Sequence, residues 1–343
     1  MKSEGEWPLN SRIPLVSVVI PNWNGGALLA VCLETLSHQT FRDFEVCVVD
    51  NGSTDGSVAY LAQHFPCVRV IANAQNLGFA AAVNQGIRAG QSRYVAVLNN
   101  DTEVAPDWLA ALVSTAERFP DAGMFASKML FANDVQVINS TGVCVDRAGI
   151  VWDRRGGEID DDREVAPVEI FGPCGGAALY RREMFGVIGL FDEDFFAYLE
   201  DVDLAWRACT AGWRCLYVPQ ACVLHRHSAT GKEGSPFKSF HLGRNKVWLM
   251  VKNYPFRALW RYVPLLVFYD MMAVLFMLAV RGDVHTLRGR WAGWLQLRRM
   301  WRKRPYISPN DRKDVACLLP PVWPWRVLRR YQHLPAVAPE HST

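Results

Sequence analysis

Two aspartates follow apolar, strand-like segments at the point where each segment stops. The segment 44–50 ends on Asp50, and the segment 94–100, YVAVLNN, runs directly into Asp101. One such carboxylate can accept the imide N–H of uracil or thymine, and one opposite it can bind a divalent cation that bridges two phosphates. Aspartate is also common in turns and helix caps, so each residue alone has an ordinary structural explanation. Together the two positions favour a site for a nucleoside diphosphate.

A second acidic group lies in the segment 199–207, LEDVDLAWR. Asp203 and Arg207 are four residues apart and are expected to form an ion pair across one helical turn. Glu200 and Asp201 fall at or before the start of that helix, where the helix dipole stabilises carboxylates without any catalytic role. The alternative is a general base directed into a cleft, and the local pattern does not decide between the two.

Two histidines follow the strand-like segment that begins at Arg214. His225 and His227 alternate, so they point to opposite sides if the strand continues, and at most one is expected to face a site. A neutral imidazole at a strand end can bind a metal ion, although a single histidine is more often a hydrogen-bonded neighbour.

The elements that must position these side chains alternate between strand and helix. The predicted strands are 16–21, 44–50, 68–73 and 94–100, and the predicted helices are 26–39, 55–65 (capped by Asp55) and 78–90. This order predicts parallel strands, right-handed crossovers and helices on both faces. The carboxyl ends of such strands line one crevice where the strand order reverses. No GxGxxG motif follows the first strand, so a Rossmann dinucleotide site is not supported.

Beyond residue 126 the pattern is less regular. The segment 153–167 is polar and rich in turn residues, which predicts either an exposed loop or a segment over a substrate site. A glycine-rich turn begins the segment 171–185, and a helix is expected to end at Gly212 before the strand that leads to the histidines.

The composition limits the class of protein. The chain has 343 residues, enough for one large domain or two ordinary ones, and half of them are hydrophobic, which indicates a packed core. The net charge of +3 is too small to imply nucleic-acid binding. Nine cysteines without a CxxC pair fit a reducing compartment. The N-terminus has no apolar segment like that of a signal peptide, so the α/β part of the chain is expected to be cytoplasmic.

The last third of the chain has a different character. Residues 263–280 carry one charge, Asp270, and residues 281–304 carry eight Lys or Arg interleaved with tryptophans. Eighteen helical residues span about 27 Å, which is marginal for a hydrocarbon core of ~30 Å. Asp270 near its middle would cost roughly 2.5–3.5 kcal/mol, and basic residues flank both ends. We therefore expect a helix that lies on an anionic membrane surface without crossing it, with a buried core helix as the alternative.

Taken in order, several segments resemble the inverting family 2 glycosyltransferases, and most closely the bacterial rhamnosyltransferase-like branch that builds surface polysaccharides. The resemblance is carried by VSVVIPNWNGG…VVDNGSTDGS, NAQNLGFAAAVNQGI, VLNNDTEV, GLFDEDFFAYLEDVDLAWRACTAGWRCLYVP and VLHRHSATG…RNKVWLMVKN. It extends from about Val16 to Asn253, roughly 70% of the chain.

The resemblance implies a GT-A fold, an α/β architecture with a Rossmann-like, mostly parallel sheet and flanking helices. The expected organisation is an N-terminal extension at 1–15, a glycosyltransferase domain at 16–253 and a helical, membrane-associating region at 254–343. Residues implied to surround the donor nucleotide are Pro21, Trp23, Asp50, Asn76, Gly78, Asn99 and Asn100.

The remaining site residues also follow from the resemblance. The sequence NND occupies the family's DxD position, where many members have an acid in place of Asn99, so Asp101 is the implied metal ligand. His225 matches a position that adds a ligand in some members, with His227 as the second choice. Asp201 is implied as the catalytic base, with Glu200, Gly175 and Gly176 on the acceptor side.

An inverting transfer needs a base for the acceptor hydroxyl and a cation or hydrogen-bond donors for the leaving diphosphate. The implied cofactor is Mg²⁺ or Mn²⁺. The favoured donor is dTDP-rhamnose, with a UDP-sugar second, and the acceptor is a lipid-linked glycan or polysaccharide precursor. The protein is expected on the cytoplasmic face of the inner membrane, as a peripheral protein that does not bind nucleic acid.

Two other functions fit the sequence less well. A sugar nucleotidyltransferase should have a basic, glycine-rich loop after the first strand, but PNWNGGALL contains no Lys or Arg. A non-catalytic sugar-nucleotide-binding protein would tolerate loss of the acid at position 201, and the acid is present.

Overall fold

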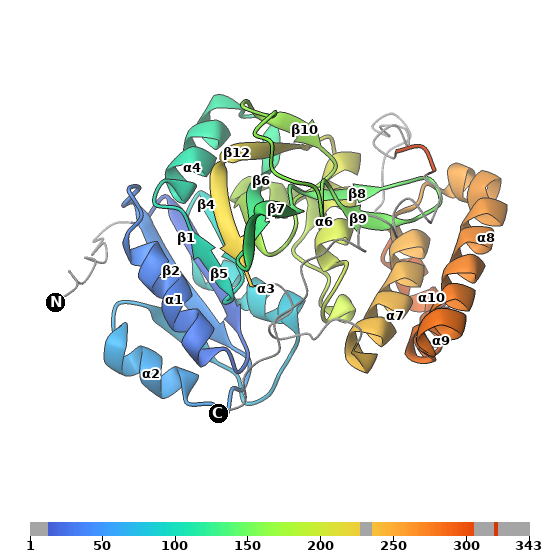
Figure 1. Ribbon diagram of the computed structural model, residues 1–343, viewed down its shortest axis with the longest axis horizontal. Helices are drawn as coiled ribbons and strands as arrows, with labels where there is room; N and C mark the ends of the chain where they lie inside the picture. Colours follow the sequence, from blue (N-terminus) through green and yellow to red (C-terminus); the bar gives the residue numbers. More distant parts are fainter. Residues whose placement is uncertain (1–12, 227–234, 305–318, 322–343) are drawn as a thin grey trace.

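The computed structural model describes residues 13–226, 235–304 and 319–321, and its centre is a ten-stranded sheet (Figure 1). The strands are β1 (Val16–Asn22), β2 (Phe44–Asp50), β3 (Arg69–Ala72), β4 (Tyr94–Leu98), β5 (Thr102–Val104), β6 (Ala122–Phe131), β7 (Asp134–Ser140), β10 (Val168–Ile170), β11 (Ala177–Arg181) and β12 (Arg214–His225). Two short strands, β8 (Val143–Val145) and β9 (Val151–Asp153), form a separate hairpin.

The strand order is β10-β12-β6-β11-β4-β1-β2-β3, with β5 paired to β12 and β7 to β6. Strands β4, β1, β2 and β3 are parallel, as predicted, and the order reverses between β1 and β4. The other half adds antiparallel pairs that the pattern did not predict, chiefly β11 between β4 and β6. The carboxyl ends of β1, β2 and β4 therefore meet at a switch point.

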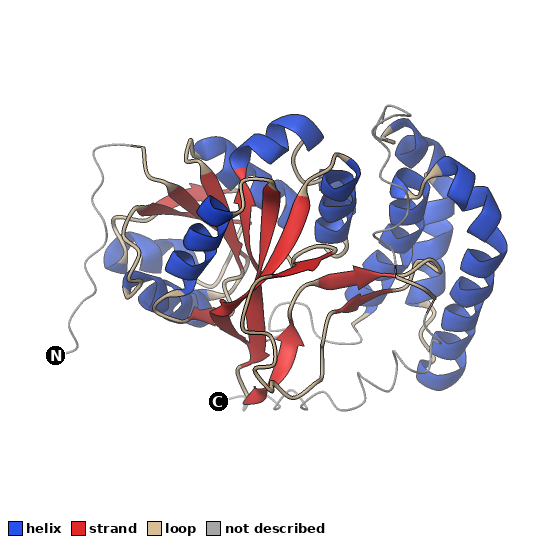
Figure 2. Ribbon diagram, turned by 90° about the horizontal axis from the view of Figure 1, so that it is seen from above, coloured by secondary structure: helices blue, strands red, loops and turns tan. Residues whose placement is uncertain are grey.

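Helices cover both faces of this sheet (Figure 2). They are α1 (Gly26–Ser37), α2 (Ser57–His64), α3 (Phe79–Ala89), α4 (Trp108–Arg118), α5 (Arg182–Ile188) and α6 (Glu200–Thr210), with a 3₁₀ turn at Glu193–Phe195. Alternate residues of β1 serve opposite faces: Val18 and Ile20 belong to the core under α1 and α4, and Val19 belongs to the core under α3. This burial on both faces explains the continuous apolar runs of the parallel strands. The predicted α/β fold is confirmed.

The predicted cap of the second helix needs a correction. Helix α2 begins at Ser57, and its N-cap is Gly56, with φ of +84°, rather than Asp55. The Asp55 carboxylate accepts hydrogen bonds from the backbone N–H groups of Ser57 and Gly26, at 3.1 and 2.9 Å. It therefore joins the starts of α1 and α2.

Four further helices lie together beside the sheet (Figures 1 and 2): α7 (Pro236–Asn253), α8 (Phe256–Arg281), α9 (His285–Leu295) and α10 (Leu297–Arg302). Within α8, Leu259–Arg281 is apolar and long enough to cross a membrane by length and composition, and only 6% of its most apolar stretch is buried. The alternative of a buried core helix is therefore wrong. The apolar helix is also longer than the eighteen residues that the sequence predicts, since 23 helical residues extend about 34 Å at ~1.5 Å each.

Candidate active site

Three buried polar side chains connect the strands that meet at the switch point. The Asn100 side-chain amide donates a hydrogen bond to Asn22 Oδ1 at 2.7 Å, and the Asn22 amide donates to Asp50 Oδ1 at 2.8 Å. The backbone N–H of Ser53 donates to Asp50 Oδ2 at 2.9 Å. Asp50 is only 1% exposed, and its hydrogen bond with Ser53 stabilises the turn that follows β2. A carboxylate has further lone pairs, which remain for a nucleotide base.

The other residues predicted around the nucleotide lie on the turns beside these strands. Pro21 is near the end of β1, and Trp23, directly after it, is 41% exposed. Gly78 caps α3 with φ of +91°, and a Cβ there would come within 2.7 Å of the Phe196 carbonyl oxygen, so no larger residue fits. Asn76 stabilises that turn, because its side-chain oxygen accepts the Gly78 N–H at 2.8 Å.

Asp101 and His225, 124 residues apart in the chain, are brought together by strand pairing. Antiparallel pairing of β5 with β12 sets Thr102 opposite His225 and leaves 3.2 Å between Asp101 Oδ1 and His225 Nε2. His225 Nδ1 lies 2.8 Å from the side-chain oxygen of Asn139. With the ring proton on Nδ1, as this contact favours, the Nε2 lone pair is directed to the Asp101 side.

This pair fits a divalent cation. Two adjacent ligands at about 2.1 Å from an octahedral ion are about 3 Å apart, close to the observed 3.2 Å separation. Asn139 has the position of an outer partner that fixes the imidazole. Within the described ranges no group of three or more His, Cys, Asp or Glu could hold a metal, so the ion's remaining ligands would be diphosphate oxygens and water. His227 lies outside the described residues.

Asp201 occupies the first turn of α6, opposite the glycine pair predicted on the acceptor side. Its Oδ2 accepts the Gly175 N–H and its Oδ1 accepts the Val202 N–H, both at 2.8 Å. A Cβ on Gly175 would come within 3.3 Å of Asp201 Cβ, so glycine allows this close approach. The next residue, Gly176, accepts the backbone N–H of Asn99 at 2.8 Å. One dipeptide therefore ties Asp201 to the NND segment.

The electrostatics of the two neighbouring acids differ from those of surface carboxylates. Burial raises the pKa of Asp201 to about 6 against its two N–H bonds, and the Asp153 carboxylate at the end of β9 adds to the rise. Burial, and then the charge of Asp201, raise the pKa of Glu200 well above its usual value. Among the described residues Glu200 Oε2 has no hydrogen-bond partner. At neutral pH this arrangement favours an ionised Asp201 beside a protonated Glu200.

Asp203 belongs to a buried network of ion pairs and hydrogen bonds, and the predicted pair with Arg207 is present at 2.9 Å. Its Oδ2 also accepts Lys252 Nζ at 2.9 Å, and its Oδ1 accepts the Asn253 amide at 2.7 Å. Burial alone would raise the pKa of Asp203, but Arg207 and Lys252 outweigh it and hold the pKa below its usual value. The last two residues of α7, absent from the predicted site, thus anchor that helix to α6.

We expect Asp203→Asn to lower the free energy of unfolding by about 3 kcal/mol, the lower end of the range for a broken buried ion pair, because Arg207 loses its carboxylate partner while Lys252 keeps Asp192 at 2.7 Å. Urea unfolding at pH 7.5 measures this. The control is Glu193→Gln, which removes a half-exposed partner of Arg88 and should cost about 0–1 kcal/mol. Equal, small losses in both variants would contradict a structural role for Asp203.

The polar segment 153–167 is held by ion pairs near this site. Lys128 of β6 lies 2.7 Å from Asp160, Arg154 pairs with Glu164, and Arg155 pairs with Asp161 at 2.6 Å. Since this segment starts at Asp153, whose charge acts on Asp201, one end of it lies close to the acidic pair.

The chain is similar to known proteins of one family. The profile of glycosyl transferase family 2 matches residues 17–189. The N-acetylglucosaminyl-diphospho-decaprenol L-rhamnosyltransferase of Mycobacterium tuberculosis is 33% identical over 250 residues, which is 66% of this chain and 81% of that protein. The O-antigen biosynthesis protein RfbC of Myxococcus xanthus is 28% identical over 259 residues, covering 71% of this chain and 20% of that protein.

Two solved structures have a similar fold. GalNAc-T7, solved with UDP, GalNAc and Mn²⁺, superposes with a TM-score of 0.58 at 18% identity, covering 80% of this chain and 58% of that chain. Residues 1–349 of S. aureus TarS superpose with a TM-score of 0.50 at 16% identity, covering 84% and 82%. These likenesses concern the fold, which is of the GT-A type.

Proposed function

Because this chain belongs to glycosyl transferase family 2, and to its rhamnosyltransferase-like branch, we propose that it transfers L-rhamnose from dTDP-rhamnose to a lipid-linked glycan during surface polysaccharide synthesis. The name of the mycobacterial relative supports both the sugar and a diphospholipid acceptor. The observation that carries the proposal is the Gly175–Gly176 turn, which hydrogen-bonds Asp201 on one side and the NND strand end on the other.

The donor would bind across the switch point. Asp50, Asn76 and Gly78 lie on the nucleotide side, and Asp101 with His225 would hold a Mg²⁺ or Mn²⁺ ion near the diphosphate. When bound, that ion supplies positive charge to the leaving diphosphate. Asn99 and Asn100 contribute amides in place of the further acid that many family members have. The domain boundaries at 15/16 and 253/254 are part of the same proposal.

The chemical step follows from the two acids. The ionised Asp201 takes the proton of the acceptor hydroxyl as its oxygen attacks the anomeric carbon from the face opposite the leaving group. The new C–O bond forms while the bond to the nucleoside diphosphate breaks, so the configuration inverts. Glu200, protonated and with a buried oxygen to satisfy, would hydrogen-bond the acceptor sugar.

The direct test is transfer by the full-length protein in detergent, followed by mass spectrometry. The assay offers dTDP-rhamnose and a set of UDP-sugars with Mn²⁺, and an N-acetylglucosaminyl-diphospho-lipid as acceptor. Rhamnose should be added to the lipid. Transfer from a UDP-sugar in preference would overturn the donor assignment, and product with retained configuration would overturn the mechanism.

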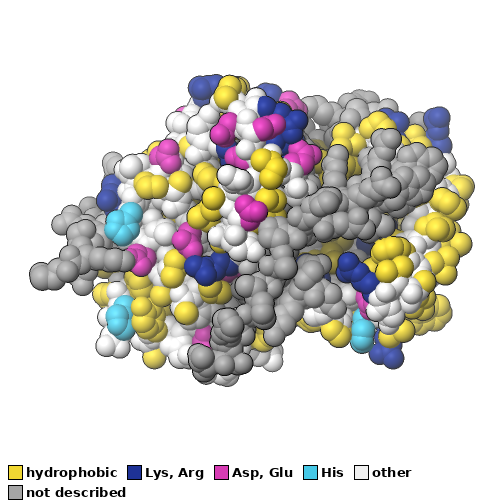
Figure 3. Space-filling model, in the orientation of Figure 1, with side chains coloured by type: hydrophobic (Ala, Val, Ile, Leu, Met, Phe, Trp, Pro, Cys, Tyr) yellow, Lys and Arg dark blue, Asp and Glu magenta, His cyan; other side chains and the backbone are white. Residues whose placement is uncertain are grey.

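The helices α8, α9 and α10 support the proposed membrane association. They expose large apolar side chains that gather on one side of the molecule (Figure 3), here called the apolar face: Trp260, Val267, Phe268, Met271, Met272, Leu275, Val280, Leu287, Trp291, Trp294, Leu295 and Trp301. Tryptophan combined with the basic residues of α9 and α10 suits a negatively charged bilayer surface.

The ion pairs of Asp270 favour a peripheral position over a spanning one. Asp270 contacts Arg290 of α9 at 2.7 Å and Lys246 of α7 at 3.1 Å. If α8 crossed the bilayer in this arrangement, both cations and their helices would have to enter the hydrocarbon with it. On the cytoplasmic surface of the inner membrane, α8 can instead bury the apolar face and keep these pairs on its protein side.

We expect alkaline carbonate to release the full-length protein from membranes, because an interfacial helix is not held by a spanning segment. The fraction in the supernatant after ultracentrifugation measures this, and an integral membrane protein in the same sample is the control. Retention in the pellet after carbonate would contradict the peripheral position, and complete solubility without detergent would contradict membrane association itself.

A further inference from the structure

A cavity of about 270 Å³ lies between the membrane-facing helices and the rest of the chain. It is lined by α7, α9, the C-terminal half of α8 and the β8–β9 turn, with Leu199 at the edge of the acidic helix. Its volume is close to the lower end of the ~300–1,000 Å³ range of small-molecule sites. It is separate from the donor residues, since none of these lines it.

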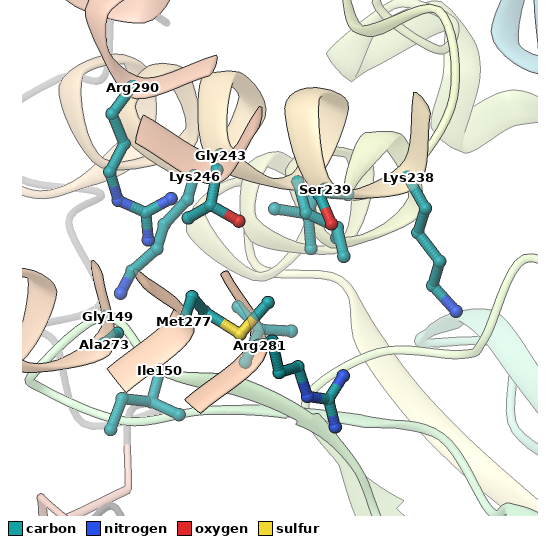
Figure 4. A pocket seen from close by; sticks show the side chains of 14 residues that line it. Gly149, Ile150, Lys238, Ser239, Gly243, Lys246, Ala273, Met277, Arg281 and Arg290 are labelled. Atoms are coloured by element: carbon teal, nitrogen blue, oxygen red, sulfur yellow. The ribbon is translucent and has the colours of Figure 1, made fainter. Parts of the chain in front are cut away.

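Four cations line this cavity, and no acidic side chain of the described residues does so: Lys238, Lys246, Arg281 and Arg290. Figure 4 shows Lys246 and Arg290 toward one end and Lys238 and Arg281 toward the other, with Met277 between them. Lys246 and Arg290 share Asp270 as a partner. Arg281, at the end of α8, has no ion pair within the described part of the chain.

Three carboxylates lie near the cavity without lining it: Asp146, Asp270 and Asp283. Asp270 contacts Lys246 and Arg290, and the oxygens of Asp146 and Asp283 accept backbone N–H groups at the β8–β9 turn and at the start of α9. The charged side chains that line the cavity itself are therefore all positive. Burial lowers the pKa of Lys246, with Asp270 opposing this. An anion in the cavity would therefore stabilise the charged form of a lysine that the protein itself desolvates.

The cavity lies between the loop that precedes Asp201 and the apolar face, and this position indicates which anion it could bind. Leu199 lies two residues before Asp201, and Lys238 Nζ is 5.8 Å from the ring centre of Tyr198 in the same loop. On its other side, α8 carries Ala273, Met277 and Arg281 into the cavity and the apolar face to the outside. A ligand here would have its anionic group between the acceptor side of the site and the membrane surface.

We propose that this cavity binds the diphosphate of the lipid-linked acceptor, with Lys238 and Arg281 as its main contacts. The proposal rests on the proposed function, and it adds a second diphosphate site that uses Lys and Arg instead of a metal ion. The acceptor sugar would extend past Leu199 toward Asp201, and the lipid chain would leave along α8 to the membrane. Arginine and lysine suit this task because both donate charge-assisted hydrogen bonds to phosphate oxygens.

The test is calorimetric binding of farnesyl diphosphate to the full-length protein in detergent, in the presence of EDTA. The chelator suppresses metal-dependent binding at the Asp101 side, so the remaining binding reports on the cavity. Wild type should bind farnesyl diphosphate at least tenfold more tightly than farnesol, and inorganic diphosphate should compete, which separates headgroup recognition from insertion of the chain. The double variant Lys238→Gln/Arg281→Gln should bind at least tenfold more weakly than wild type.

Arg288→Gln/Arg298→Gln is the matched control, because it removes the same number of charges from α9 and α10 at exposed positions outside the cavity. Unchanged affinity in the double variant, or equal losses in the double variant and the control, would overturn the proposal. Binding of dTDP with Mn²⁺ checks that the double variant is folded. If wild type transfers no sugar but binds farnesyl diphosphate through these residues, the proposed function fails and the anion site remains. If transfer occurs and the double variant binds normally, only the cavity assignment fails.

Discussion

Asp201→Asn is expected to lower kcat by roughly 10²–10⁴-fold while changing donor affinity little, since general-base catalysis contributes about that much and the donor binds elsewhere. The asparagine keeps the size of the side chain and can still accept the Gly175 N–H, but it cannot take a proton from the acceptor hydroxyl at neutral pH. Single-turnover transfer with dTDP-rhamnose, together with calorimetric donor binding, measures the two quantities separately.

The matched variant is Glu200→Gln, which alters the neighbouring acid in the same way. If Glu200 only contacts the acceptor sugar, its variant should raise the acceptor KM and keep most of kcat. If Glu200→Gln is inactive and Asp201→Asn keeps its activity, Glu200 is the base and the assignment to Asp201 is wrong. Loss of stability should not explain a loss of activity. A carboxylate whose folded pKa is raised opposes folding when it ionises, so near pH 7 the asparagine variant avoids that cost.

The pKa of Asp201 also fixes a pH dependence for the wild type. A base must be unprotonated, and burial raises the pKa of Asp201 to about 6, so kcat should be constant above pH 7 and fall about tenfold per pH unit below pH 6. The kcat profile between pH 4.5 and 8.5 tests this. A midpoint near 4, the ordinary value for aspartate, would contradict a buried base.

Local periodicity was sufficient for the first half of the fold because each parallel strand is buried on both faces and each helix has one apolar face. The strand ends at Asp50 and Asp101 could be located for the same reason. The pairing of Asp101 with His225 could not be derived from spacing, since it depends on the register of β5 against β12. That register is set by tertiary contacts that no local pattern contains.

Other site residues were missed because their neighbours in space are distant in sequence. Asn22 accepts a hydrogen bond from the side chain of the predicted Asn100 across the switch point, although an asparagine at the end of a strand is typical of turns. Asn139 meets His225 from a strand that the pattern did not predict. The contacts of Asp270 were missed likewise, so it was counted as an isolated charge when it has Arg290 and Lys246 as partners.

Asp101→Ala is expected to weaken donor binding in Mn²⁺ by at least ~100-fold, about 2.8 kcal/mol, because it removes the carboxylate of the proposed metal site. In EDTA the wild type should already have lost this contribution, so the variant and the wild type should then bind the donor equally. Calorimetry with dTDP-rhamnose in both conditions measures the difference, and Mn²⁺ binding followed by electron paramagnetic resonance measures the metal without any turnover.

Two further variants separate the metal site from its surroundings. Glu103→Ala removes the same charge from the next but one residue, whose carboxylate pairs with Arg226 at 3.0 Å on the exposed side, and it should bind the donor normally. Asn139→Ala leaves both proposed ligands but frees the imidazole, and partners of metal-bound histidines typically contribute 10–100-fold in metal affinity. Because the ion would take only two side-chain ligands from the described residues, each should matter more than in a closed site. If Asp101→Ala keeps its Mn²⁺-dependent affinity while Glu103→Ala loses it, the diphosphate is held by a different acid.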